Sequence, residues 1–159
     1  MNRKAVYPGT FDPMTRGHLN IIERASAMYD EVIVLIMYNG VKKCTFTEHE
    51  RKEMIERETT HLNNVKVHIG QGLTVHTASA LGAEVMIRGI RATSDYEYEL
   101  QIATANMMLD PKVETVFLMS RPEYSFVSST TVKEIAMFHG ELSNFVTPYV
   151  RQCLMQKYQ

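Results

Sequence analysis

The stretch KAVYPGTFDPMTRGH, residues 4–18, joins a predicted strand to a predicted helix. Residues 4–7 form a short strand pattern that Pro8-Gly9 ends, and a polar loop covers 10–16. From Gly17 onward, apolar residues recur at helical spacing: Leu19, Ile21, Ile22, Ala25, Met28 and Tyr29. The start of this helix directs unpaired N–H groups and the positive end of the helix dipole back toward the loop. The stretch therefore predicts an anion site between a strand and a helix.

Outward from this stretch, short apolar runs alternate with segments of helical spacing. Further strands are predicted at 31–38, 65–69, 84–88 and 115–119. Helices are predicted at 47–60, 73–81, 94–109, 128–140 and from 147 onward, and two capping boxes, Thr47 with Glu50 and Ser94 with Glu97, mark helix starts. Strict alternation favours an α/β fold, a doubly wound five-stranded parallel sheet with an extra C-terminal helix. We expect a single domain over residues 1–159.

Composition argues against several classes of protein. Lys and Arg number 17 against 18 Asp and Glu, a net charge of −1, which is unlike a chain that binds long nucleic-acid duplexes. The longest aliphatic run, residues 32–37, is too short to span a bilayer. The first residues show no signal-peptide h-region, and Cys44 and Cys153 make neither a disulfide framework nor a zinc site. We expect a cytoplasmic protein without nucleic-acid or membrane partners.

Ligands of open parallel sheets bind beyond the carboxyl ends of the strands, where the strand order reverses. The first loop at that edge holds Gly9, which permits a close ligand, and His18, whose imidazole could donate a hydrogen bond to a phosphate. Lys42 and Lys43 follow the second strand. Such a pair is usually solvated, but a mobile ammonium at this edge suits a phosphate.

Two further loops at this edge carry residues suited to phosphate. Arg88 and Arg91 flank Gly89 at the end of the fourth strand, where a guanidinium suits bidentate phosphate binding. The alternative is that both arginines cap a helix or form salt bridges. The run Ser128-Ser129-Thr130 starts a helix after the fifth strand, and three hydroxyl residues exceed what one N-cap requires.

The helix predicted at 94–109 has two apolar stripes. A narrow polar line contains Asp95, Glu99 and Asn106. The stripes on either side of it are Tyr96, Leu100, Ala103 and Met107, and Tyr98, Ile102, Ala105 and Leu109. A surface helix normally needs only one stripe. Two stripes imply burial on both sides, either in a subunit interface or between the sheet and its neighbours.

Three of these segments together resemble the nucleotidylyltransferase superfamily. The residues TRGH at 15–18 match its T/HxGH signature, and FVSSTTVKE at 126–134 resembles its second signature, ISSTxxR/K. The string YPGTFDP at 7–13, with IRGIR at 87–91 and DYEYE at 95–99, resembles the bacterial phosphopantetheine adenylyltransferase family. The resemblance runs nearly end to end. It departs from the family pattern at 44–45 and 139–141, outside the signatures.

The resemblance implies a Rossmann-like nucleotidylyltransferase fold and a specific reaction. In that reaction the adenylyl group of ATP passes reversibly to 4′-phosphopantetheine, giving dephospho-coenzyme A and pyrophosphate by in-line displacement. It also implies Mg²⁺ as a cofactor, held mainly by substrate oxygens and water rather than by dedicated protein ligands. Family members resembling this chain are homohexamers, and coenzyme A is a candidate feedback ligand.

The resemblance assigns roles to individual residues. The expected catalytic residues are His18, which donates to the α-phosphate, Arg91, which steadies the β- and γ-phosphates, and Thr10 and Lys42, which hold the acceptor phosphate. Residues expected to bind ATP are Thr10, Phe11, His18, Gly89, Ile90, Arg91, Glu99, Tyr124, Ser125, Phe126, Val127, Ser128, Ser129 and Thr130. Residues expected to bind the acceptor are Thr10, Lys42, Thr74, Arg88 and Asn106.

Two alternatives stay open. The first is a nucleotidylyltransferase with another phosphorylated acceptor, such as nicotinate mononucleotide or glycerol 3-phosphate, because those relatives share part of the first motif. The second is a non-catalytic nucleotide-binding module on the same fold, because a fold alone does not give a function. A pure binding module has no need of a donor at the α-phosphate, so His18 favours an enzyme.

Overall fold

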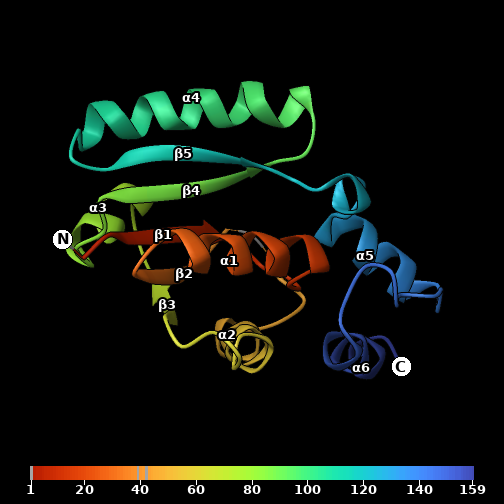
Figure 1. The fold of residues 1–159 in the computed structure, drawn as a ribbon. Helices are drawn as coiled ribbons and strands as arrows, with labels where there is room; N and C mark the ends of the chain where they lie inside the picture. Colours follow the sequence, from red (N-terminus) through yellow and green to blue (C-terminus); the bar gives the residue numbers. More distant parts are fainter. Residues whose placement is uncertain (1, 39, 42) are drawn as a thin grey trace.

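The computed structural model describes residues 2–38, 40–41 and 43–159 (Figure 1). The described strands are β1 (Lys4–Gly9), β2 (Glu31–Met37), β3 (Val65–Gly70), β4 (Val85–Ile90) and β5 (Glu114–Met119). All neighbouring strands are parallel, in the order β3-β2-β1-β4-β5. The predicted five-stranded parallel sheet is confirmed, and strand order reverses between β1 and β4.

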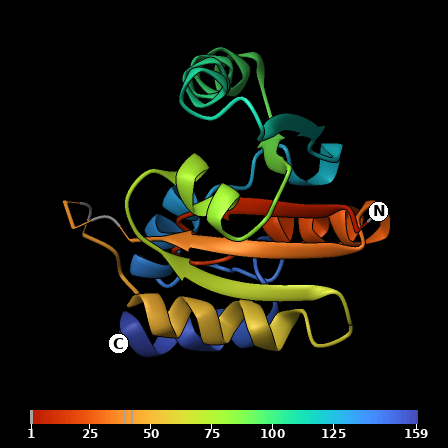
Figure 2. The ribbon, with the colours of Figure 1, turned by 90° about the vertical axis from the view of Figure 1, so that its left-hand side faces the viewer.

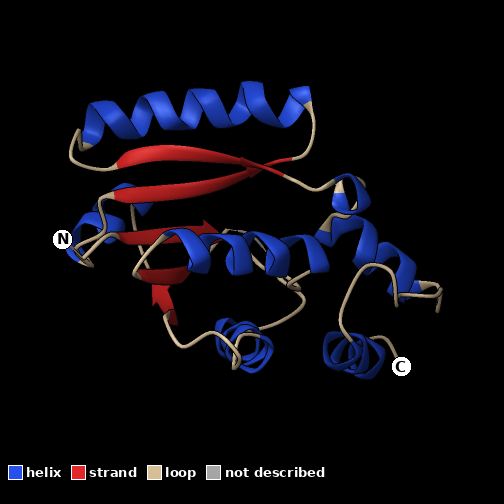
Figure 3. Ribbon diagram, in the orientation of Figure 1, coloured by secondary structure: helices blue, strands red, loops and turns tan. Residues whose placement is uncertain are grey.

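The helices between the strands are α1 (Arg16–Met28), α2 (Glu48–Glu58), α3 (Thr74–Ala80), α4 (Thr93–Leu109), α5 (Ser129–Met137) and α6 (Pro148–Lys157) (Figure 3). A short 3-10 helix, η1 (Pro122–Tyr124), was not predicted. The capping box of Thr47 and Glu50 is confirmed. The capping box of Ser94 and Glu97 is wrong, because the N-cap of α4 is Ala92, two residues before Ser94, and it makes no side-chain capping bond.

Helices cover both faces of the sheet, with a smaller helical cluster beside it (Figure 2). On one face the core contains strand residues such as Tyr7, Val34 and Ile87, packed with residues of α1 such as Ile22. On the other face, residues of α3 pack against strand residues such as Ile33. A third core joins α2, α5 and α6 and contains Phe46, Met54, Val127, Val132, Ala136, Leu142, Val146, Val150 and Leu154. These three cores hold the strands and helices whose connecting loops lie at the carboxyl edge of the sheet.

Strand β1 continues two residues past its predicted end at Tyr7. Pro8 and Gly9 stay in register with β2, whereas pairing of β1 with β4 covers only Ala5 and Val6. The Pro8 carbonyl points toward the β4 side, where it accepts a hydrogen bond from Arg88. In a strand, the N–H and C=O of one residue point to the same side, so the missing N–H of Pro8 removes no hydrogen bond to β2. Strands β1 and β4 therefore separate beyond Val6.

Candidate active site

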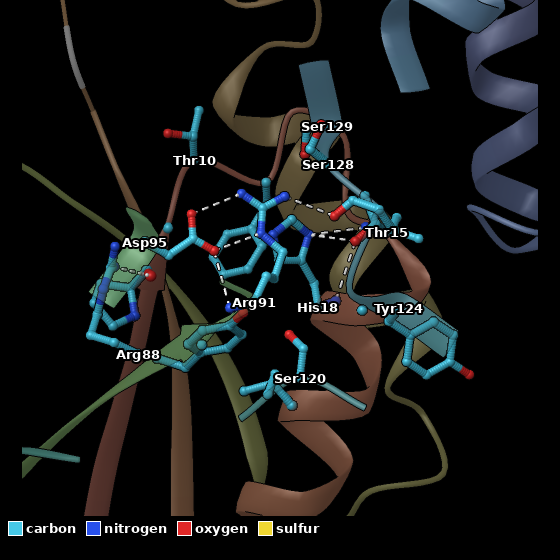
Figure 4. Close-up of a pocket in the computed structure, with 18 of the residues that line it drawn as sticks. Thr10, Thr15, His18, Arg88, Arg91, Asp95, Ser120, Tyr124, Ser128 and Ser129 are labelled. Atoms are coloured by element: carbon cyan, nitrogen blue, oxygen red, sulfur yellow. Dashed lines mark hydrogen bonds and ion pairs between the residues drawn. The ribbon is translucent and has the colours of Figure 1, made fainter. Parts of the chain in front are cut away.

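A cavity of about 310 Å³ opens where β1 and β4 separate. Its walls come from the loop after β1, the start of α1, the end of β4 and the start of α5 (Figure 4). Of the residues predicted from the sequence, those that line it are Thr10, Phe11, His18, Arg88, Gly89, Arg91, Glu99, Tyr124, Val127, Ser128, Ser129 and Thr130. Segments far apart in the sequence thus meet at the point where the strand order reverses, as the topology predicts.

The T/HxGH segment forms the capping box of α1. The Thr15 side chain accepts from the backbone N–H of His18, and the backbone N–H of Thr15 donates to Nδ1 of His18 over 3.0 Å. Because Nδ1 accepts this bond, the proton of the neutral ring lies on Nε2. Burial, reinforced by Arg91 and Arg88, lowers the pKa of His18 from 6.5 to about 4. His18 is therefore a neutral Nε2–H donor at pH 7.

Phe11 fixes the other side of the His18 ring. Its backbone lies in the left-handed region with φ 50°, and its ring meets His18 edge to face with centroids 5.0 Å apart. A Cβ at Gly9 would lie 2.9 Å from the Phe11 ring, closer than real Cβ contacts. Gly9 is therefore required by the folded-back Phe11, whereas the sequence had suggested only a close approach of a ligand.

Arg91 spans the cavity between α4 and the start of α5 (Figure 4). Its Nη1 donates to the Val127 carbonyl over 3.0 Å, and its Nε donates to Asp95 over 3.1 Å. The backbone N–H of Arg91 also donates to Asp95, and these bonds hold the pKa of that carboxyl below its usual range even though burial acts to raise it. Asp95 thus orients a guanidinium that lies close enough to His18 to lower the pKa of the imidazole.

The half-buried Arg88 and the buried Glu99 form a bidentate pair. Nε and Nη2 of Arg88 donate to the two Glu99 oxygens over 2.6 and 2.7 Å, and Nη1 donates to the Pro8 carbonyl. Burial acts to lower the pKa of Arg88, but the bonds to Glu99 outweigh it and raise that pKa. The salt bridge predicted as the alternative for Arg88 is present, and Glu99 occupies the Nε–Nη2 edge. The phosphate-binding role of Arg88 stays a prediction, and it would have to use the remaining N–H groups. Glu99 is predicted to contact ATP, and in this structure both of its carboxylate oxygens accept hydrogen bonds from Arg88.

The hydroxyl residues at the start of α5 are divided between capping and cross-linking. Ser128 is the N-cap and accepts from the Thr131 N–H, so only one serine caps the helix, as predicted. The Ser129 hydroxyl donates to the Pro13 carbonyl over 2.7 Å, which joins α5 to the loop after β1. Both serines and Thr130 line the cavity at the helix N-terminus, where backbone N–H groups attract anions.

Some predicted residues lie elsewhere. Lys42 is outside the described residues, and Thr74, Ile90, Ser125, Phe126 and Asn106 do not line the cavity. Asn106 faces β4 instead, with its amide donating to Met86 Sδ over 3.7 Å. Phe126 is 87% exposed beside the cavity-lining Val127. The binding roles of these residues remain predictions.

Sequence reasoning missed the groups that hold the loop after β1. The Asp12 side chain, 3% exposed, accepts from the backbone N–H groups of Thr45 and Phe46 and from Lys133 Nζ. The buried Arg51 donates to the Phe46 and Thr10 carbonyls. Asp12 lies between the apolar residues Phe11 and Pro13, and this context could have indicated that its side chain is buried. Arg51 lies in a helix rich in charged residues, and no sequence feature distinguishes it from the exposed ones.

Within ranges 2–38, 40–41 and 43–159, no group of three or more His, Cys, Asp or Glu side chains could hold a metal ion. No helix in the same ranges is both long and apolar enough to cross a bilayer.

Comparisons with known proteins agree with this geometry. The sequence matches the family described as cytidylyltransferase-like over residues 6–135, from β1 into α5. The chain belongs to this family. It is therefore a nucleotidylyltransferase, and the cavity at the T/HxGH helix is its candidate active site.

Two solved structures show the same fold. A candidate nicotinate-nucleotide adenylyltransferase from Vibrio parahaemolyticus is 16% identical with a TM-score of 0.73, and the match covers 99% of this chain and 96% of that one. The Plasmodium falciparum nicotinic acid mononucleotide adenylyltransferase, complexed with NaAD, is 14% identical with a TM-score of 0.68 over the same shares. At these identities the likeness establishes the Rossmann-like nucleotidylyltransferase fold and not the acceptor.

Proposed function

We propose that the protein transfers the adenylyl group of ATP to the phosphate of 4′-phosphopantetheine. The observation that carries the proposal is the neutral His18 Nε2–H donor beside Arg91 in one cavity, at the N-terminal ends of two helices. The resemblance at 87–91 and 95–99 supports phosphopantetheine as the acceptor. The acceptor phosphate is itself an anionic nucleophile, so the proposed reaction requires no nucleophile from the protein.

The chemical step requires no strong base. An oxygen of the acceptor phosphate, already an anion, attacks the α-phosphorus of ATP. The new P–O bond forms as the bond from the α-phosphorus to the bridging oxygen breaks, and pyrophosphate leaves with that electron pair. The barrier therefore lies in bringing two polyanions together and in stabilising charge at the α-phosphate, which positioning and fixed donors supply.

The geometry suggests a division of labour among the lining residues. His18 donates from Nε2 to the α-phosphate. Arg91, with the N-terminus of α5, binds the β- and γ-phosphates. Thr10 and the N–H groups of Arg88 left free by Glu99 hold the acceptor phosphate. Lys42, outside the described residues, is proposed to assist there.

Mg²⁺ fits this proposal as a partner of the triphosphate. The hydroxyls of Thr10, Ser128 and Ser129 are among the neutral oxygens that line the cavity, and no group of three or more His, Cys, Asp or Glu side chains in the described residues competes for the ion. Such a site suits an ion bound mainly through substrate oxygens and water. When bound, Mg²⁺ would neutralise charge on the triphosphate.

Helix α4 supports self-association, and a homohexamer is the proposed assembly. Only Glu99 of α4 is buried, whereas Tyr98, Leu100 and Met108 are 64%, 44% and 83% exposed. The alternative that α4 lies sunk between the sheet and its neighbours is wrong, because α4 runs along the β5 end of the sheet with both stripes largely open (Figure 1). A mass measurement in solution tests the hexamer, and a monomeric mass would reject it.

Pyrophosphate release tests the function. We expect release with ATP and 4′-phosphopantetheine, and none when CTP replaces ATP. Nicotinate mononucleotide and glycerol 3-phosphate are the competing acceptors in the same assay. Pyrophosphate release with one of these instead would reassign the acceptor. No release with any combination of nucleotide and acceptor would favour a nucleotide-binding module. Coenzyme A contains the whole of the proposed product, dephospho-coenzyme A, plus one phosphate. We therefore expect coenzyme A to inhibit the reaction by occupying the same cavity.

A further inference from the structure

The hydroxyl of Tyr7 has no role in the chemistry derived so far. Tyr7 is only 6% exposed, yet it lines the cavity. Its oxygen makes no hydrogen bond to any of the described residues. Among the described residues, every side-chain N or O atom that solvent cannot reach has a hydrogen-bond partner. Because the Tyr7 oxygen has none, it must be accessible to solvent, and the cavity that Tyr7 lines gives that access. A nearly buried phenol with an open hydroxyl is unusual, because buried polar groups are normally paired.

Packing holds this hydroxyl in one place. Tyr7 belongs to the core under α1, and its ring meets Phe11 edge to face with centroids 5.3 Å apart. The His18 ring centroid lies 6.5 Å from that of Tyr7. An atom at the Cβ position of Gly89 would lie 3.9 Å from the hydroxyl, which places the oxygen beside the backbone between Arg88 and Arg91.

The charges around Tyr7 decide which way it can bond. Burial raises the pKa of Tyr7 well above its usual value, although Arg88 and Arg91 act to lower it, so the phenol keeps its proton. The two guanidinium groups attract the lone pairs of the oxygen. The Glu99 carboxylate attracts the O–H bond and so favours the protonated phenol, but both Glu99 oxygens accept from Arg88 and neither bonds to Tyr7. The phenol oxygen is thus held in place by its ring, keeps its proton and has no partner among the described residues, so the O–H can rotate to donate to an anionic oxygen in the cavity.

We propose that the Tyr7 hydroxyl donates a hydrogen bond to an oxygen of the ATP phosphate chain that is bound between Arg88 and Arg91. Within the proposed reaction this is the α-phosphate, which lies between the acceptor phosphate and the leaving pyrophosphate. Tyr7 and His18 then bind the α-phosphate from two directions. This assignment rests on the proposed function, whereas the contact to the phosphate chain itself does not depend on the acceptor.

The variant Tyr7→Phe tests the proposal, because it removes one oxygen and keeps the packed ring. Loss of a hydrogen bond to a charged group lowers an equilibrium or rate constant by about 10- to 150-fold, so we expect kcat/KM to fall by that factor. We expect ATP affinity, measured by calorimetry, to fall at least about threefold. The thermal midpoint should stay within about 1 °C, since the hydroxyl contributes no bond within the protein. Tyr29→Phe is the matched control, because Tyr29 packs against the same core without lining the cavity.

The outcomes separate this proposal from the proposed function. Unchanged ATP affinity and unchanged kcat/KM in Tyr7→Phe would overturn the contact. A lower thermal midpoint with unchanged affinity would also overturn it and assign a packing role. If the wild type turns over no acceptor but Tyr7→Phe still loses ATP affinity, the contact stands and the proposed reaction fails.

Discussion

Acidification provides the most direct test of the His18 environment. The pKa of His18 is about 4 in the folded protein against an ordinary 6.5, and the shift is caused mainly by burial, with Arg91 and Arg88 adding to it. Between these values the unfolded chain binds a proton that the folded chain does not. The contribution of His18 to stability is therefore complete above pH 6.5 and is lost progressively as the pH falls toward 4.

The size of the effect follows from the two pKa values. At about 1.36 kcal/mol per pKa unit, the shift of His18 from 6.5 to about 4 changes the free energy of unfolding by at most about 3.4 kcal/mol across the whole pH window. Near pH 5 the unfolded ring is almost fully protonated and the folded ring is about one-tenth protonated, which gives a slope of about 1.2 kcal/mol per pH unit. Urea denaturation of the wild type and of His18→Gln at several pH values between 4.5 and 7 measures this slope.

Glutamine is a suitable replacement because it does not titrate, and its side-chain oxygen can still accept from the Thr15 N–H. Other titrating groups contribute equally to both proteins, so the difference between the two slopes belongs to His18. Equal slopes would refute the argument that burial and the two arginines keep the ring neutral. An NMR titration of the His18 ring in the folded protein gives the same pKa independently.

Three further substitutions test the rest of the site. His18→Ala should keep its fold and much of its ATP affinity but lose about 10²–10³ in kcat, because it removes one transition-state donor, and equal rates would remove His18 from the mechanism. Glu99→Gln should cost about 2 to 3 kcal/mol in urea unfolding, because it leaves the guanidinium of Arg88 without its charge partner, and a loss under 0.5 kcal/mol would show that the pair contributes little. Asp12→Asn should cost about 2 kcal/mol in the same measurement, because an amide cannot accept all three donors, whereas the exposed control Asp30→Asn should change stability by less than about 0.5 kcal/mol.

Much of the fold could be predicted because the periodicity is local. The run at 32–37 is apolar throughout, which is typical of a strand covered on both faces, and β2 has that burial. Thr47 and Thr147 precede helices as caps, and both capping hydrogen bonds are present. The capping box of Ser94 and Glu97 is absent because the helix begins at Thr93, and Asp95 in its first turn bonds back to Arg91. Arg91 is also held by the Val127 carbonyl, a tertiary contact that a local pattern does not record.

The sequence by itself determined the sheet, most helix starts and the residues at the carboxyl edge, because hydrophobic period and capping act within a few residues of each other. Only the tertiary structure decided which of those residues are free to meet a ligand. Glu99 lies eleven residues beyond Arg88 and pairs with its guanidinium, and Lys133 donates to Asp12 from 121 residues further along the chain. The open hydroxyl of Tyr7 likewise depends on β1 and β4 separating, and no short-range pattern records the distance between two strands.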